Sequence, residues 1–213
     1  MTFSILARDP ETGHLGVATA TGKIAVGAQV PHLQSGIGAI ATQGFTTNPL
    51  YAEEGFQLLE DGRSVSKVVQ ALVGCDQGRD WRQVIVIDRF GRTAGATGSA
   101  NEAVMGHVEE DDLAIAGNML AGDGVLPAMR AAYLGVSDRP LAIRLLEALK
   151  AGEEQGGDKR GTCSAAMKVQ DDAPWPLDLR VDFAADPLSV LDDLYGRSTQ
   201  TDYVSFRQSL PGR

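Results

Sequence analysis

The fold is decided by the stretch TFSILAR at Thr2–Arg8 and by its continuation at His14–Thr21. Apolar Phe3, Ile5 and Ala7 occupy every second position of the first stretch, which is the period of a β-strand with two different faces. The residues between the two stretches include Pro, Thr and Gly, which favour a turn. We therefore predict an N-terminal β-hairpin, with the remaining residues of its first strand on the opposite face.

Outside this hairpin, strands and helices come in blocks. Amphipathic periodicity and cap signals predict helices at 48–60, 65–73, 125–133, 142–149 and 186–195. Alternating or wholly apolar runs predict strands at 26–29, 38–42, 81–88, 92–97, 113–117, 162–169 and 177–183. The block order favours a layered α+β fold over a doubly wound sheet, in which strands and helices alternate. We expect one domain at 1–197 and a polar C-terminal tail at 198–213.

The charge balance is acidic. The 213 residues include 19 Lys and Arg against 28 Asp and Glu, which gives a formal net charge of −9. Nucleic acids and anionic membranes are poor partners for such a chain, because no basic excess is present to neutralise phosphates. No apolar run approaches the roughly 18 residues of a membrane-spanning helix. We expect neither nucleic acid nor membrane as a partner, although a local basic group can still bind a small anion.

Two further features predict a cytoplasmic protein. The N-terminal residues lack the charged and apolar regions of a secretory signal. The two cysteines, Cys75 and Cys163, lie far apart and outside any C-x-x-C motif, which favours free thiols in a reducing compartment. Because unpaired cysteines are usually buried, both are expected in the core.

Motifs for cofactors and metals are missing from the sequence. It contains no nucleotide-binding glycine pattern, no phosphate-binding loop, and neither a zinc-protease nor a serine-hydrolase signature. The three histidines, His14, His32 and His107, share no spacing typical of metal ligands. We therefore expect neither a metal nor an organic cofactor.

The candidate that remains is the second residue, Thr2. A small residue after the initiator Met1 permits removal of the methionine, and a free N-terminal threonine then carries both a hydroxyl and an α-amine. The amine titrates near pH ~8 and lies beside the hydroxyl, so it can act as the general base for that hydroxyl. Ser4 shares the strand face of Thr2, so both hydroxyls are expected to line one cleft.

Six segments of the chain form an ordered set of motifs: TFSILARD at 2–9, LGVA at 15–18, GAIATQ at 38–43, NPxY at 48–51, GNML at 117–120 and GGDKRGTCSAA at 156–166. From residue 2 to about 196, the chain with these motifs resembles a widespread bacterial family of unknown function that is assigned to the N-terminal-nucleophile (Ntn) hydrolase superfamily. The resemblance implies a four-layer αββα sandwich and hydrolysis of an amide bond by an N-terminal residue without a cofactor. In the family, Gln is common at the position of Cys163, so Cys163 is not expected to be the nucleophile.

Other residues complete the candidate site. Asn118 ends a predicted strand just before a helix start, where its amide and nearby backbone N–H groups can stabilise an oxyanion. In the glycine-flanked loop GGDKRG, Arg160 can grip a carboxylate and Asp158 can hold the amine of Thr2 or of a substrate. Lys23 is the cation next to the predicted hairpin. We assign catalysis to Thr2, Asn118 and Asp158, and substrate binding to Ser4, Lys23 and Arg160.

The predicted function is hydrolysis of a small-molecule amide or peptide-like substrate by Thr2 after removal of Met1. A homodimer is expected from the resemblance, because members of the superfamily commonly bury helices against other subunits. Two alternatives stay open. In the first, the fold serves a non-catalytic protein that binds a small anion or acts as an oligomeric scaffold. In the second, Lys23 activates the hydroxyl of Thr2 or Ser4 without a free amine.

Overall fold

The computed structural model describes residues 2–212. Their strands are β1 (Thr2–Arg8), β2 (Leu15–Thr21), β3 (Pro31–Gln34), β4 (Gly38–Gly44), β5 (Arg82–Asp88), β6 (Thr93–Thr97), β7 (Gly106–Glu110), β8 (Leu113–Asn118), β9 (Ser164–Val169) and β10 (Leu177–Val181). Their α-helices are α1 (Leu50–Glu60), α2 (Val65–Cys75), α3 (Val125–Gly135), α4 (Leu141–Glu154), α5 (Pro187–Ser198) and α6 (Thr201–Gln208). Two short 3-10 helices are η1 (Val26–Ala28) and η2 (Arg79–Trp81). The predicted α+β class is confirmed.

The strands form two antiparallel sheets. One has six strands in the order β10-β9-β2-β1-β8-β7, and the other has four in the order β3-β4-β5-β6. In the larger sheet β1 is central, because it pairs with β2 on one side and with β8 on the other. The N-terminal hairpin predicted from the sequence therefore forms the middle of the larger sheet.

The two faces of β1 meet different surroundings, as its alternation predicts. Phe3, Ile5 and Ala7 belong to a core that includes residues of α3, α4 and α5, among them Met129 and Leu145. Burial of a side chain of this size contributes about 1.5–3 kcal/mol to stability. The amphipathic helices α3 and α4 are held on the sheet mainly by this apolar contact.

A second core fills the space between the two sheets. Leu6 and Val17 of the larger sheet pack there with Ala39, Ala41 and Ile85 of the smaller one. Small alanine side chains allow the two sheets to approach closely. On the same face of β1, the next residue toward the N-terminus is the polar Ser4, which is close to the candidate site.

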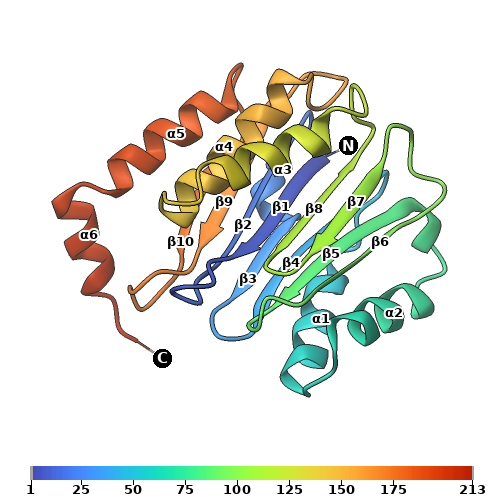
Figure 1. Cartoon of the computed structure of the whole chain (residues 1–213), viewed down its shortest axis with the longest axis horizontal. Coiled ribbons are helices and arrows are strands. Elements are labelled where there is room, and N and C mark those ends of the chain that lie inside the picture. Colours follow the sequence, from blue (N-terminus) through green and yellow to red (C-terminus); the bar gives the residue numbers. More distant parts are fainter. Residues whose placement is uncertain (1, 213) are drawn as a thin grey trace.

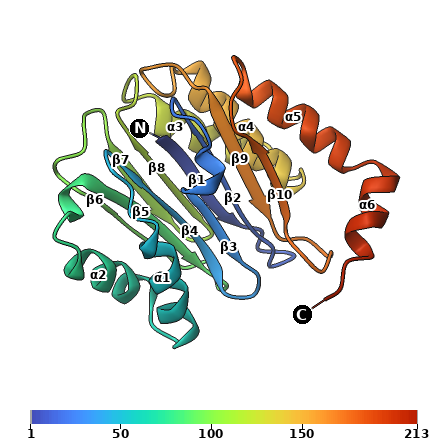
Figure 2. The same ribbon diagram turned by 180° about the vertical axis from the view of Figure 1, so that it is seen from behind.

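A third core lies between the smaller sheet and α1 and α2. Ile40, Val84 and Val86 of the sheet pack there against residues that include Tyr51 and Leu72 of the helices. Figure 1 shows α3 and α4 in front of the sheets, and Figure 2, from behind, brings α1 and α2 to the front. The sheets thus lie between two groups of helices.

Several segments differ from the predictions. Residues 26–29, predicted as a strand, contain the 3-10 helix η1 at Val26–Ala28, and buried Val26 and Val30 pack between the sheets from this segment. The sequence patterns predict neither β3 nor β7, which are short edge strands with many partly exposed residues. Polar edge strands lack the apolar alternation that reveals central strands. The segment expected to be a polar tail contains α6, whose Arg207 forms an ion pair with Asp171 at 2.6 Å.

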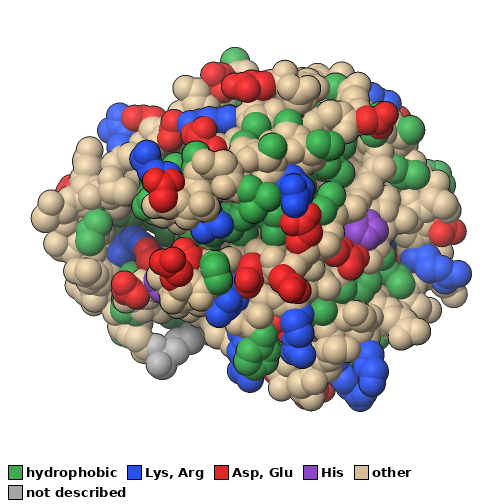
Figure 3. All heavy atoms as spheres, in the orientation of Figure 1, with side chains coloured by type: hydrophobic (Ala, Val, Ile, Leu, Met, Phe, Trp, Pro, Cys, Tyr) green, Lys and Arg blue, Asp and Glu red, His purple; other side chains and the backbone are tan. Residues whose placement is uncertain are grey.

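The surface carries both charge signs. On the face shown in Figure 3, Lys and Arg side chains lie among Asp and Glu side chains. Cys75 is exposed and Cys163 is partly exposed, so the expectation that both cysteines lie in the core is wrong. Among the described residues, no helix combines the length and the apolarity needed to cross a bilayer.

Candidate functional site

A pocket of about 750 Å³ opens where β1 begins. Thr2 and Gln43 line its buried part, and Lys23, Phe45 and Phe183 line its more exposed part. Figures 1 and 2 both show the start of β1 near the end of α3 into which β8 leads. Met1, whose removal the sequence predicts, lies outside the described residues.

Antiparallel pairing gathers polar side chains beside this pocket, between the two sheets. Thr2 lies opposite Asn118 in the β1–β8 pair, and Gln43 lies opposite Gln83 in the β4–β5 pair. We call the buried polar set the polar end: Thr2, Ser4, Thr19, Thr21, Gln43, Gln83 and Asn118. Each of its members is at most 5% exposed. Buried polar groups are costly unless they are hydrogen-bonded, so their bonding pattern decides what the site can do.

Gln83 fixes the direction of the hydrogen bonds in the polar end. Its Nε2 lies 2.9 Å from both the Gly106 and the Gly117 carbonyl oxygens, which can only accept. The Oε1 of Gln83 must therefore accept, and it does so from Gln43 Nε2 at 2.6 Å and from Asn118 Nδ2 at 2.9 Å. Two backbone carbonyls thus determine which way three side-chain amides point.

The direction of these amides also determines the role of Ser4. Gln43 directs its Oε1 to Ser4 Oγ at 2.6 Å, so Ser4 donates its single proton there. The proton between Ser4 Oγ and Thr19 Oγ1, which are 2.8 Å apart, then comes from Thr19. Ser4 is fully buried and does not line the pocket, so the expected cleft with both hydroxyls holds only Thr2.

Asn118 is left with one unsatisfied atom. Its Oδ1 is buried and has no hydrogen-bond partner among the described residues. Its Nδ2 donates to Gln83, and neither Asn118 nor the start of α3 lines the pocket. The expected oxyanion role requires an N–H that faces the reacting carbonyl, whereas the free group here is an acceptor opposite Thr2.

Asp158 and Arg160 are paired with each other. Arg160 Nη2 and Nε donate to the Asp158 carboxylate at 2.9 and 3.2 Å, and the Gly22 N–H donates to it at 2.6 Å. Burial raises the pKa of Asp158, but the hydrogen bonds from Arg160 and Gly22 outweigh burial and hold that pKa below its ordinary value. A Cβ at Gly22 would lie 2.5 Å from the Gly161 carbonyl oxygen, so only glycine fits this contact.

The Asp158–Arg160 pair therefore does not occupy its expected positions. Neither residue lines the pocket, and the two-pronged grip of Arg160 is used on Asp158. The pair instead holds the Gly22 backbone, which is part of the pocket wall next to Lys23. We attribute to Asp158 and Arg160 the shaping of this wall.

Two other sequence candidates do line the pocket. Lys23 does so, and its backbone carbonyl accepts a hydrogen bond from Ser164 Oγ at 2.6 Å. The ammonium group of Lys23 forms no ion pair with any described residue. Cys163 also lines the pocket, and its N–H donates to the Thr21 carbonyl at 2.9 Å. Across residues 2–212, no group of three or more His, Cys, Asp or Glu side chains is arranged to hold a metal ion.

Comparison with known proteins identifies the family. The model of a family of unknown function, DUF1028, matches residues 2–191. The chain belongs to this family. The crystal structure of protein SPO2555 from Silicibacter pomeroyi, which carries the same family designation, is 38% identical, with a TM-score of 0.92 over 99% of this chain and 95% of that one. Anbu (ancestral beta-subunit) from Yersinia bercovieri is 12% identical, with a TM-score of 0.43 over 99% of both chains. Among curated proteins, no match to the chain is found.

Two site residues of this DUF1028 chain are missed by motif reasoning. Gln43 and Gln83 connect the smaller sheet to Thr2 and Asn118, since Gln43 Nε2 also donates to the Thr2 carbonyl at 3.2 Å. Each is a buried glutamine next to the terminal residue of a central strand, Gln43 in GAIATQG and Gln83 in RQVIVID. That placement is the signal that could have identified them, because a buried glutamine needs a partner on a neighbouring element.

Proposed function

We propose that this DUF1028 protein is an Ntn-type amidohydrolase that uses Thr2 as its nucleophile after removal of Met1. The observation that carries the proposal is the position of Thr2, a buried threonine on the wall of a 750 Å³ pocket and in contact with a directed polar network. Its Oγ1 lies 3.3 Å from Thr21 Oγ1. The order of helices, sheet, sheet and helices also fits the αββα sandwich of Ntn hydrolases.

The reaction proceeds in two halves. Thr2 Oγ1 bonds to the amide carbonyl carbon while the α-amine accepts the hydroxyl proton. The amine then gives this proton to the substrate nitrogen as the C–N bond breaks, which releases the amine product and leaves an ester on Thr2. A water molecule that the α-amine deprotonates attacks the ester, the Thr2 oxygen regains a proton, and the carboxylic acid leaves. General-base assistance of this kind accelerates such steps by roughly 10²–10⁴-fold.

In this mechanism Asn118 holds the amine. The α-amine of a chain that starts at Thr2 is a donor in need of an acceptor, and Asn118 Oδ1 is a buried acceptor without a partner in residues 2–212, on the strand position opposite Thr2. Gln83 prevents Asn118 from turning its amide over. The hydrogen bond directs the amine and favours its protonated form, so it raises the pKa of the amine.

The first experiment is an intact-mass measurement combined with acylation of the N-terminus by a β-lactone. We expect Met1 to be absent and a single acyl group on Thr2, and we expect Thr2→Ala to abolish both labelling and amide hydrolysis. Thr47→Ala, at another pocket threonine, is the matched control and should keep both. Labelling of Thr2 in a chain that retains Met1 would contradict the free-amine mechanism and favour activation by Lys23. A folded chain that starts at Thr2 and is never acylated would favour the non-catalytic, anion-binding alternative.

The second experiment measures the pKa of the Thr2 amine from the pH dependence of its reaction with cyanate, followed on the N-terminal peptide. Asn118→Asp places a negative charge beside the ammonium group and should raise this pKa by roughly one unit, whereas Asn118→Leu should lower it. An unchanged pKa in both variants would remove Asn118 from the mechanism.

A further inference from the structure

The pocket beside Thr2 changes in character from its floor to its mouth. The floor is polar and buried, with Thr2 5% and Gln43 1% exposed. The mouth is apolar and open, with Ile24 69%, Phe45 41% and Phe183 74% exposed. Its volume of about 750 Å³ falls in the ~300–1,000 Å³ range of small-molecule sites, which usually combine apolar walls with a few placed polar groups.

The charge of the pocket wall is opposite to that of the chain. Although the net charge is −9, no described Asp or Glu lines this pocket, and Lys23 is the one Lys or Arg on its described wall. Lys159 and Arg160, the cations of the adjacent GGDKRG loop, are neutralised by Glu102 at 2.8 Å and Asp158 at 2.9 Å. Lys23 has no such partner in residues 2–212, so its charge is available to a ligand.

We infer that the pocket takes small amides that carry a carboxylate next to an apolar group, in the manner of an N-acylated aromatic or branched amino acid. The amide part of this inference rests on the proposed function. The carboxylate pairs with Lys23, and the apolar group packs on Phe45 and Phe183. The acyl end then extends toward the buried floor, where Thr2 lies.

Each half of the ligand has a physical reason to bind. A carboxylate at the mouth gains a charge-assisted hydrogen bond from an ammonium group that no protein carboxylate occupies. Because Lys23 is exposed to solvent, its attraction for the carboxylate weakens as salt is added. An aromatic side group removes its own apolar surface and that of two exposed phenylalanines from water. A cationic ligand lacks the first contribution, and a ligand without an apolar group lacks the second.

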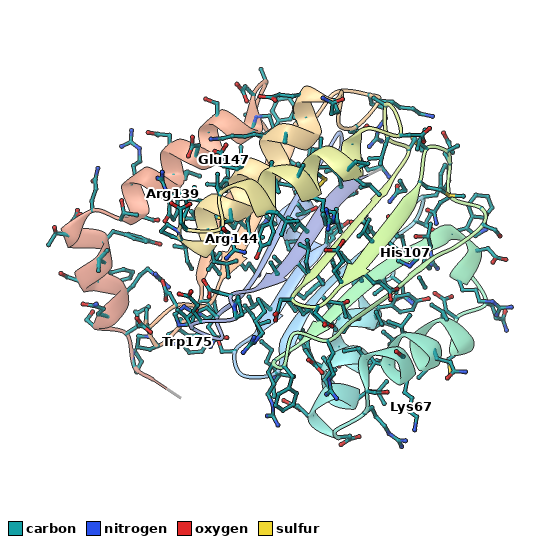
Figure 4. The ribbon with its side chains drawn as sticks, in the orientation of Figure 1. Lys67, His107, Arg139, Arg144, Glu147 and Trp175 are labelled. Carbon is teal, nitrogen blue, oxygen red and sulfur yellow. The ribbon has the colours of Figure 1, made fainter. Side chains whose placement is uncertain are left out.

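The test measures binding rather than turnover, in a chain that lacks Met1 and carries Thr2→Ala. Isothermal titration calorimetry compares the affinities for N-acetyl-L-phenylalanine, for its C-terminal amide and for N-acetylglycine. We expect N-acetyl-L-phenylalanine to bind, and the other two compounds to bind at least roughly tenfold more weakly. Lys23→Gln should weaken binding of the acid about three- to tenfold and leave binding of the amide unchanged. Lys67→Gln is the matched control, because Lys67 is an exposed lysine of α2, beyond the smaller sheet (Figure 4).

The outcomes separate this inference from the proposed function. Equal affinity for the acid and its amide, equal losses in Lys23→Gln and Lys67→Gln, or no binding of any of the three compounds would overturn the ligand class. Selective binding of the acid, together with no acylation or turnover by the chain that starts at Thr2, would contradict the proposed hydrolysis alone.

Discussion

The space between the two sheets contains two regions of opposite chemistry. One region is dry and apolar, and the other is the polar end beside the pocket. The change occurs within each strand, from one inward position to the next: Leu6 to Ser4 in β1, Val17 to Thr19 in β2, Ala41 to Gln43 in β4, Ile85 to Gln83 in β5, and Ala116 to Asn118 in β8. Five strands from two sheets therefore change at the same end of the molecule.

This difference shows where the chain gives up stability. A buried polar group without a partner costs about 1–3 kcal/mol, and a satisfied one contributes less than a well-packed apolar side chain. An apolar layer could have continued to the end of all five strands. In the polar end, hydrogen bonds instead orient the amides of Gln43, Gln83 and Asn118. They leave Asn118 Oδ1, on the residue opposite Thr2, without a partner among the described residues. Such departures from the stable solution are typical of functional sites.

The largest effect on stability is expected from the apolar region. Ile85→Ala removes a fully buried side chain between the sheets and should lower the free energy of unfolding by about 3–4 kcal/mol, measured by urea denaturation. Acylation of Thr2 should persist in the folded fraction, because no hydrogen bond of the polar end is lost. Loss of acylation in a chain that is still folded would show that the two regions are not separable.

Gln83→Leu, one inward position away on the same strand, should cost about 3 kcal/mol. It removes the buried acceptor for Gln43 and Asn118 and the donor to two backbone carbonyls, of which that of Gly117 is buried and that of Gly106 partly buried. Unlike Ile85→Ala, it should also reduce acylation of Thr2 by at least tenfold, since Asn118 is then free to turn its amide. Equal acylation in the two variants would contradict the directing role of Gln83.

An acid titration separates the polar end from a third region, the cluster around Asp76. Burial raises the pKa of Asp76, but hydrogen bonds from Gly78, Arg82, Tyr51 and Asn48 outweigh it and lower that pKa from 3.8 to about 2. Because the folded-state pKa is lowered, the stabilisation is complete above pH ~4 and is lost as pH falls toward 2. Its size is about 2 kcal/mol, so Asp76→Asn should lose that amount at pH 7 and little at pH 2.

This cluster serves as the control for the Thr2 amine. Asp76 connects α1, α2 and β5, and it stays ionised above pH 5. A change in Thr2 reactivity between pH 6 and pH 9 therefore comes from the polar end and not from Asp76. Asp76→Asn should leave the pH profile of Thr2 acylation in place, and a shifted profile would contradict this separation.

The sequence predicts the parts of the fold that repeat with a period. The alternation in β1 and the amphipathic patterns of α2 and α4 correctly identify both the elements and their buried faces. Position 2 also stands out, because Thr2 follows Met1 and shares a face with Ser4. The motifs indicate a family of unknown function, and the model of such a family, DUF1028, matches residues 2–191, while the Ntn assignment stays a prediction. The homodimer, the cytoplasmic location and the amide substrate stay predictions.

What sequence reasoning misses depends on contacts between distant residues. Gln43 and Gln83 are 40 residues apart and meet only because β4 and β5 pair in one register. The orientation of Asn118 depends on Gln83, which in turn depends on two carbonyl groups of other strands. Arg160 has the guanidinium group that could bind a substrate carboxylate, but this group is paired with Asp158, two residues earlier in the chain. No local pattern distinguishes such a pair from a binding site.

The smallest effect, that of Ser4→Ala, decides between two nucleophiles. The change removes the donor to Gln43 Oε1 and the acceptor for Thr19, while the methyl group keeps most of the packing, so the expected cost is about 1 kcal/mol. Because Gln43 keeps its bonds to Gln83 and to the Thr2 carbonyl, the amides stay directed and acylation of Thr2 should fall no more than a few-fold. If the Ser4 hydroxyl were instead the group activated by Lys23, Ser4→Ala would abolish labelling entirely and Thr2→Ala would not. Mass spectrometry of the N-terminal peptide of both variants therefore shows whether Ser4 is part of the hydrogen-bond network or is the nucleophile. The complete burial of Ser4 favours the role in the network.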